Sequence, residues 1–393
     1  MVKRVLNTYY GIIFIFELAL SFFFSIYAIF LVSHGLSLFE VNLVNCVFML
    51  GCFVFEVPTG AFADGLGRKQ SFIISCFTMS LSLLVYYLSS TIAGFMLAEL
   101  IAALAITFHS GAFEAWMIDS VKYYDKGYDL DPVYRRSTQI LQLGRIVGVI
   151  SGAYVAQINL ALPWLYSSIG MFIVGFVSIF IIKEEYWQTE KGFKALPAIM
   201  QIGRDSIKYG FKEKGVLFII VVSLLFSFTC MPLNMFWQLR YTEDFLLPVK
   251  SMGYIHAGAL FVMMLGAWLV RYKYLLRTEK HAILTTLILF VVGIIVASLD
   301  ASLYLVLSGY LLHEISRGLY VPLKSAYINS RIPSRVRATI LSFEGMMGKL
   351  GALLGLLVSG IIAETFSVRI SWLSVATVMI LAIPFLFFAR NGE

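Results

Sequence analysis

Long apolar stretches alternate with short polar ones along almost the whole chain. A helix needs about 20 apolar residues to cross the hydrocarbon core of a bilayer. Stretches of that length fall near residues 8–32, 38–63, 70–89, 93–119, 137–158 and 161–182. A second set falls near residues 215–239, 249–270, 281–299, 302–326, 337–362 and 367–389. The pattern predicts an all-α integral membrane protein with twelve transmembrane helices in two six-helix bundles.

One longer polar interruption divides the chain. We therefore expect an N-terminal bundle over 1–182, a cytoplasmic linker over 183–214 and a C-terminal bundle over 215–393. Apolar residues at roughly helical spacing in 196–211 indicate a helix lying along the membrane surface, and a flexible connector is the alternative. A weak repeat supports the two halves, because Arg-Ser-Thr at 136–138 followed by Gly144 matches Arg-Ala-Thr at 337–339 followed by Gly345.

The basic residues set the expected orientation. On the predicted topology, 24 Lys and Arg residues lie in loops and termini on one side of the membrane and 3 on the other. Cytoplasmic loops carry the excess of Lys and Arg, so both termini are expected in the cytoplasm, with the protein in the cell membrane. The formal net charge of +7 does not indicate nucleic-acid binding, because the basic residues are interleaved with apolar stretches.

The loop between the second and third predicted helices carries the most specific motif. Its spacing is Gly60-x-x-x-Asp64-x-x-Gly67-Arg68-Lys69. This closely resembles the loop motif of the major facilitator superfamily, in residue type, spacing and position; a generic basic hairpin is the alternative. The resemblance implies parallel duplicated halves, each with inverted repeats, around a central site. The resemblance is to the drug-efflux-like branch of that superfamily, although the Gly-Pro motif that antiporters often carry in the fifth helix lacks its proline here, at 147–152.

In the superfamily this loop latches the cytoplasmic side. Its aspartate faces the start of the eleventh helix, and its arginine pairs with an acid at the end of the fourth. The resemblance therefore assigns Asp64, Arg68 and Asp119 to a gating latch, together with Gly60, Gly67 and Lys69. The second half lacks both acids of such a latch, because Asn329 stands where the first half has Asp119. We expect the latch to be asymmetric.

Ionisable residues within membrane segments are costly and usually functional. Counted at 1.5 Å per residue, four of them lie at a similar depth in the first half and are candidates for proton coupling: Glu17, Glu56, Glu114 and Arg145. Because one guanidinium cannot neutralise three carboxylates, at least one glutamate is expected to carry a proton near neutral pH. Glu17 is the first choice for this role, and Glu114 with Arg145 is the preferred ion pair. A structural glutamate satisfied by a neighbouring helix is the alternative for Glu17.

Other polar and aromatic residues are candidates for the wall of a substrate cavity. In the first half they are Tyr10, Phe14 and Glu99. In the second half they are Asn234, Trp237, Gln238, Glu314, Arg317, Tyr320, Glu344 and Lys349. The two acids and two bases among these leave that half roughly neutral, so structural pairing within it is the alternative to substrate contact.

Motifs of soluble enzymes do not appear. The Gly345-to-Lys349 stretch has the wrong spacing for a phosphate loop, and the four cysteines lack the spacing of metal ligands. We therefore expect no enzyme activity, no metal and no cofactor, with the proton as coupling ion.

The leading hypothesis is a monomeric proton-coupled exporter of a small amphipathic or lipophilic compound, and the alternative is a proton-coupled importer of a polar metabolite. A membrane receptor or enzyme on the same scaffold is a further alternative.

Overall fold

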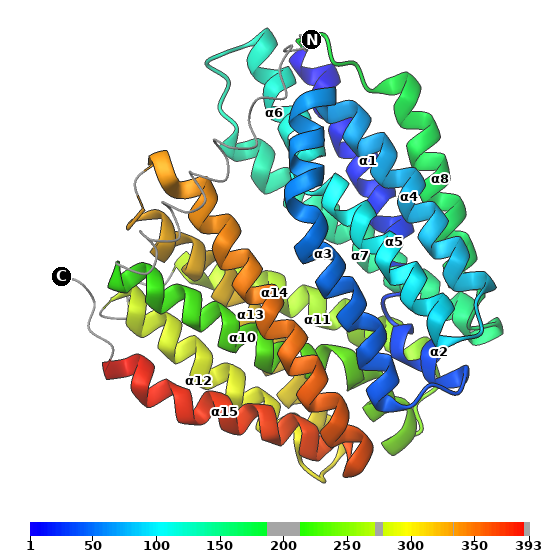
Figure 1. Ribbon diagram of the computed structural model, residues 1–393, viewed down its shortest axis with the longest axis vertical. Helices are drawn as coiled ribbons and strands as arrows, with labels where there is room; N and C mark the ends of the chain where they lie inside the picture. The colour runs from blue at the N-terminus through cyan, green and yellow to red at the C-terminus, as the bar shows by residue number, and fades with distance from the viewer. Residues whose placement is uncertain (187–212, 272–277, 333, 389–393) are drawn as a thin grey trace. The chain divides into compact units, whose positions relative to one another are not determined.

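The computed structural model describes residues 1–186, 213–271, 278–332 and 334–388, except for the side chains of 57, 61, 63–66 and 334–339. The described residues form helices, with no strand among them (Figure 1). The first half contains α1 (Val2–Ser21), α2 (Tyr27–Ser33), α3 (Leu38–Leu66), α4 (Arg68–Leu88), α5 (Ile92–His109), α6 (Ala112–Tyr124), α7 (Asp131–Ile158) and α8 (Leu162–Ile181). The second contains α10 (Lys214–Leu239), the π-helix η1 (Arg240–Asp244), α11 (Lys250–Leu269), α12 (Glu279–Ser298), α13 (Leu303–Asn329), α14 (Ser334–Thr365) and α15 (Val368–Phe388).

Ten described helical segments are long and apolar enough to cross a membrane. α1 and α13 are not among the ten. These two helices also carry buried acids, Glu17 in α1 and Glu314 in α13. Two of the predicted stretches are each divided into two helices, by turns at 22–26 and at 110–111. The all-helical class is therefore confirmed, and the count of twelve spans stays a prediction.

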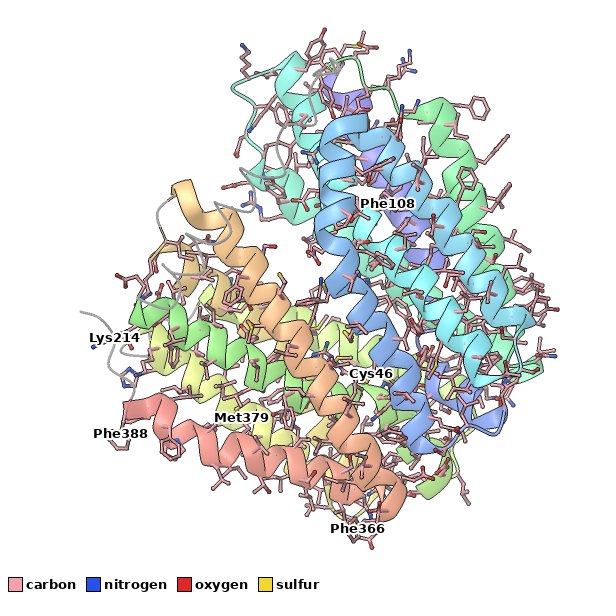
Figure 2. All side chains as sticks on the ribbon, viewed as in Figure 1. Cys46, Phe108, Lys214, Phe366, Met379 and Phe388 are labelled. Carbon is pink, nitrogen blue, oxygen red and sulfur yellow. The ribbon has the colours of Figure 1, made fainter. Side chains whose placement is uncertain are left out.

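Large apolar side chains cover the outside of the helices. Figure 2 shows Phe366 and Phe388 projecting outward, and these rings are among many exposed leucine, isoleucine and phenylalanine side chains. A soluble monomer rarely exposes extensive contiguous apolar surface, because water disfavours it. Lipid is the solvent that suits this surface.

The chain divides into two compact units. Unit 1 comprises Met1–Leu36, Val47–Lys191 and Tyr241–Ala257; unit 2 comprises Ser37–Cys46, Gly192–Arg240 and Gly258–Glu393. The sequence places the domain boundaries at the linker alone. In the structure, the first residues of α3 also belong to unit 2, and the first residues of α11 belong to unit 1. The predicted surface helix over 196–211 lies outside the described residues.

Glycines bring α1 and α7 of unit 1 into close contact. In α7, a Cβ at Gly148 would lie 2.5 Å from the carbonyl oxygen of Leu18, and one at Gly152 only 1.8 Å from that of Phe22. Only glycine permits such an approach of α1, because any side chain would overlap the opposing backbone. The four-residue glycine spacing therefore determines how closely α1 and α7 pack.

Unit 2 uses the same arrangement. In α14, a Cβ at Gly351 would lie 2.1 Å from the carbonyl oxygen of Leu224, and one at Gly355 would lie 2.2 Å from that of Phe228. α10 and α14 thus pack as α1 and α7 do, with glycines on the later helix against the backbone of the earlier one. This correspondence is a structural sign of duplication, in addition to the sequence repeat.

Candidate functional site

Unit 1 contains a buried ion pair between α1 and α7. The Nε atom of Arg145 donates to Oε2 of Glu17 at 2.7 Å, and Nη2 donates to Oε1 at 3.3 Å. The Glu17 side chain is 6% exposed and that of Arg145 is 31% exposed. Gly144 lies one residue before Arg145, and its missing Cβ leaves room for the backbone of α1, so the guanidinium can reach the carboxylate.

This geometry corrects the preferred pairing. Arg145 was expected to bind Glu114, but it binds Glu17, and the Glu114 side chain lies exposed in the first turn of α6. The break at Ser110–Gly111 explains the difference, because Gly111 adopts a positive φ of 71° and a new helix begins there. Helical phase counted along one continuous helix therefore misplaces Glu114. Glu56 lies half-buried in α3.

A polar network in unit 2 joins α10 and α13. The Nη1 atom of Arg317 donates to both carboxylate oxygens of Glu314 at 2.9 Å and to Oδ1 of Asn234 at 2.9 Å. Nδ1 of His313 lies 3.1 Å from Oε1 of Glu314. The Glu314 carboxylate is buried, whereas the Arg317 guanidinium is partly exposed, so part of the guanidinium stays accessible. Three predicted cavity candidates, Asn234, Glu314 and Arg317, thus lie together.

A second ion pair in unit 2 joins α13 and α14. Nζ of Lys324 donates to Oε1 of Glu344 at 2.8 Å. Lys324 lies in α13, which continues to Asn329. The buried Glu344 thus has a basic partner on a neighbouring helix.

The remaining cavity candidates occupy separate positions. Trp237 and Gln238 are buried near the end of α10, and Trp237 stacks on Tyr310 with ring centroids 5.4 Å apart. Tyr320 stacks on Phe226, with its hydroxyl 3.0 Å from that of Ser223. In unit 1, the Arg136 guanidinium lies over the ring of Tyr10. Phe14 lies in α1, where its carbonyl oxygen is close to Gly144, and Lys349 lies in α14.

The loop motif is held by residues that follow α8. The carboxylate of Glu184 accepts the backbone N–H of Arg68 at 2.8 Å and of Lys69 at 3.3 Å, and thereby caps the start of α4. The side chain of Lys69 donates to the carbonyl oxygen of Ile179 at 2.8 Å. Gly67 precedes this cap with a φ of 105°, a conformation that favours glycine. Sequence reasoning missed Glu184, because it assigned this residue to the linker.

Tyr186 completes this arrangement. Its hydroxyl donates to Oε1 of Glu184 at 3.1 Å. Burial and the nearby carboxylates of Glu184 and Asp119 raise the pKa of Tyr186, whereas the Arg68 guanidinium lowers it. Asp119 and Arg68 therefore both influence the pKa of the Tyr186 hydroxyl, in opposite directions. The Asp64 side chain lies outside the described residues, and a Cβ added at Gly60 would meet no described atom within 4 Å.

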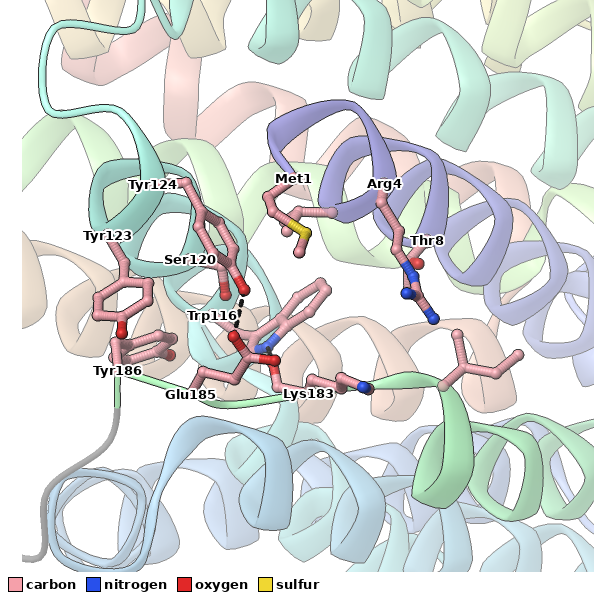
Figure 3. Close-up of a pocket in the computed structure, with 12 residues that line it drawn as sticks. Met1, Arg4, Thr8, Trp116, Ser120, Tyr123, Tyr124, Lys183, Glu185 and Tyr186 are labelled. Carbon is pink, nitrogen blue, oxygen red and sulfur yellow. Dashed lines mark hydrogen bonds between the residues drawn. The ribbon is translucent and has the colours of Figure 1, made fainter.

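A pocket adjoins this region in unit 1. Its lining comes from the start of α1, the end of α6 and the residues after α8. Figure 3 shows Trp116, Tyr124 and Glu185 around it, with Arg4 on the α1 side. The Tyr124 hydroxyl donates to Glu185, and the Trp116 indole donates to the carbonyl oxygen of Lys183. Trp116 thus anchors the chain after α8.

No protein-family model matches the chain. It is 25% identical over 371 residues to the uncharacterized MFS-type transporter YxaM of Bacillus subtilis strain 168, covering 93% of this chain and 91% of that protein. It is 24% identical over 125 residues to multidrug resistance protein 2 of the same organism, covering 32% of this chain and 30% of that protein.

Solved structures share the fold. The nucleoside transporter NupG has a TM-score of 0.82 and 16% identity, covering 98% of this chain and 100% of that one. A bacterial homologue of the human lysosomal transporter Spinster has a TM-score of 0.76 and 14% identity, covering 99% and 96%. The chain therefore has the fold of these membrane transporters. Together with YxaM, these similarities support the resemblance to the major facilitator superfamily that the loop motif indicated.

Proposed function

We propose that the protein is a secondary transporter that moves a small organic solute across the cell membrane by alternating access, coupled to protons. The observation that carries this proposal is the pair of buried carboxylate–guanidinium contacts, Glu17 with Arg145 and Glu314 with Arg317, within helices of a chain that has a transporter fold. Ionisable groups persist at such positions when the function needs them, since their burial is costly. YxaM, which shares most of the chain's length, is also named a transporter.

The architecture proposed for this function is the one expected from the sequence. It comprises twelve transmembrane helices in two bundles, 1–182 and 215–393, with a cytoplasmic linker and both termini in the cytoplasm. The cytoplasmic latch in this proposal consists of Gly60, Asp64, Gly67, Arg68, Lys69 and Asp119. Glu184 caps the start of α4, where Arg68 and Lys69 lie. The transporter needs no cofactor other than the coupling proton.

Export of a small amphipathic compound is the first candidate for direction and substrate. The partial similarity to multidrug resistance protein 2 supports it. Because Arg145 already neutralises the Glu17 carboxylate, this acid does not by itself favour a cationic compound.

Uptake of a polar metabolite is the second candidate. Arg145 and Arg317 each keep roughly a third of the side chain exposed, and Asn234 provides an amide beside Arg317. Such donors suit a solute with hydrogen-bond acceptors. The fold of the nucleoside transporter NupG agrees with a polar solute.

Transport in proteoliposomes tests the proposal. A pH gradient is imposed, and proton flux is recorded while a chemically diverse set of solutes is added on either side. Coupled transport predicts proton movement with one class of solute, and the side from which that solute acts gives the direction. Glu17→Gln is expected to abolish proton-driven transport but keep solute exchange, whereas Glu185→Gln, outside the helices, leaves both intact. Absence of solute-dependent proton flux across the whole set would refute proton coupling.

A further inference from the structure

A carboxyl group in α5 has only hydroxyl groups as polar side-chain partners. Glu99 is 5% exposed. Its Oε1 atom accepts a hydrogen bond from the Tyr27 hydroxyl at 2.6 Å and another from the Tyr86 hydroxyl at 2.5 Å. Glu17, Glu314 and Glu344 each have a basic partner, but no Lys, Arg or His side chain among the described residues pairs with Glu99.

The three oxygen atoms form a closed triangle. Its third edge joins the hydroxyls of Tyr27 and Tyr86, which are 3.2 Å apart. Each tyrosine has one hydroxyl hydrogen, so an ionised Glu99 leaves two hydrogens for three edges. A protonated Glu99 supplies the third. It can then donate to Tyr86, Tyr86 to Tyr27, and Tyr27 back to Oε1, so every edge holds one hydrogen bond. The triangle has one place for an additional proton.

Aromatic rings enclose this triangle. The indole of Trp164 in α8 stacks on the Tyr86 ring with centroids 4.0 Å apart, and the Phe95 ring stacks on Tyr86 with centroids 5.6 Å apart. Tyr86 and Trp164 are both buried. A carboxylate shielded from water in this way, without a cation, costs free energy that a neutral carboxyl group does not.

The surrounding elements supply few other titratable groups. α2 contributes Tyr27, α4 contributes Tyr86, and α8 contributes the non-titrating Trp164. Gly51 of α3 lies against α5 beside the side chains of Leu100 and Ala103, which do not titrate. The imidazole of His34, another titratable group, lies tilted against Phe30 and edge-on to Phe95.

The triangle is attached to a break in a helix. Tyr27 is the first residue of α2 and directly follows residues 22–26, which separate α1 from α2. Ser25 within this break donates to the carbonyl oxygen of Val149 in α7 at 2.9 Å. A change in the hydrogen bonds of Tyr27 therefore acts on a point where the backbone is not held by regular helical bonds.

We propose that Glu99, with the hydroxyls of Tyr27 and Tyr86, is a proton-binding site of the transport cycle. This inference rests on the proposed proton-coupled transport and adds to Glu17 a second proton site, at a residue that the sequence placed in the substrate wall. When the proton binds, an O–H bond forms on Glu99 and the Tyr86 hydrogen turns from Glu99 to Tyr27. When it leaves, the hydrogen turns back.

Infrared difference spectroscopy of the protein in lipid vesicles tests this site without any substrate. The C=O stretch of a protonated carboxyl group is followed while the pH is raised in steps. The wild type is expected to lose one such band on titration, and Glu99→Gln is expected to lack it. Tyr86→Phe removes one hydroxyl of the triangle and is expected to shift the titration midpoint of the band. Glu17→Gln is the matched control and is expected to keep the band.

The same set of titrating carboxyl bands in Glu99→Gln and in the wild type would overturn the inference. So would a midpoint that Tyr86→Phe and Tyr27→Phe both leave unchanged. Because the infrared measurement does not depend on transport, failure of this site is distinguishable from failure of the proposed function. A titrating Glu99 without solute-dependent proton flux contradicts the proposed function, whereas coupled flux without a Glu99 band contradicts this site alone.

Discussion

Removal of the Arg145 guanidinium is expected to destabilise the protein, because the Glu17 carboxylate then stays buried without its cation. The two groups share contacts of 2.7 and 3.3 Å, and the carboxylate has almost no access to solvent. Breaking a buried ion pair costs about 3–5 kcal/mol. Since the Arg145 side chain is 31% exposed, solvent screens part of this interaction, and we expect the lower end, about 3 kcal/mol or roughly a 150-fold change in the folding equilibrium.

A double-mutant cycle measures this pair. Arg145→Gln, Glu17→Gln and the double variant are compared by reversible unfolding in mixed detergent micelles. Arg145→Gln is expected to lose the most stability, and adding Glu17→Gln is expected to restore part of it, with an interaction free energy of about 1–3 kcal/mol. Arg369 and Asp300 provide the control pair, with a contact of 3.0 Å but an Asp300 side chain that is 88% exposed. Their coupling is expected to stay below about 1 kcal/mol.

Two results would refute this reasoning. One is a loss of stability in Arg145→Gln that does not exceed that of Arg369→Gln. The other is additivity of Glu17→Gln and Arg145→Gln, since independent effects mean that the pair contributes nothing beyond its separate side chains.

Two further predictions concern packing and the loop motif. Gly152→Ala places a Cβ 1.8 Å from the Phe22 carbonyl oxygen and is expected to lower the free energy of unfolding, in heat or detergent, by about 1–3 kcal/mol. Gly11→Ala, whose Cβ would have no atom within 4 Å, is the control. Equal stabilities of the two variants would contradict the role of Gly152. Glu184→Gln weakens the cap of α4, so amide hydrogen exchange at Arg68 and Lys69 is expected to accelerate. Glu185→Gln affects only the bond from Tyr124, and equal exchange in both variants would exclude the cap.

The glycine spacing in α7 indicated close helix contact, but the partner of that contact came from the fold. Gly144, Gly148 and Gly152 are visible as a four-residue pattern. The structure shows that α1 is the partner and that this contact delivers Glu17 to Arg145. Periodicity identifies the face of a helix but not the helix opposite to it.

The sequence by itself determined that the chain is helical and apolar, where most of its helices begin and end, and which loop carries the motif. These features follow from short-range rules, namely segment length, hydropathy and turn-forming glycines. Only the tertiary structure decided which polar groups are paired. Arg145 binds Glu17 rather than Glu114, Lys324 binds Glu344, and Glu184 accepts the backbone N–H of Arg68. The physical reason is that each of these contacts joins different helices or crosses a long separation in the chain, where packing rather than local pattern brings the atoms together.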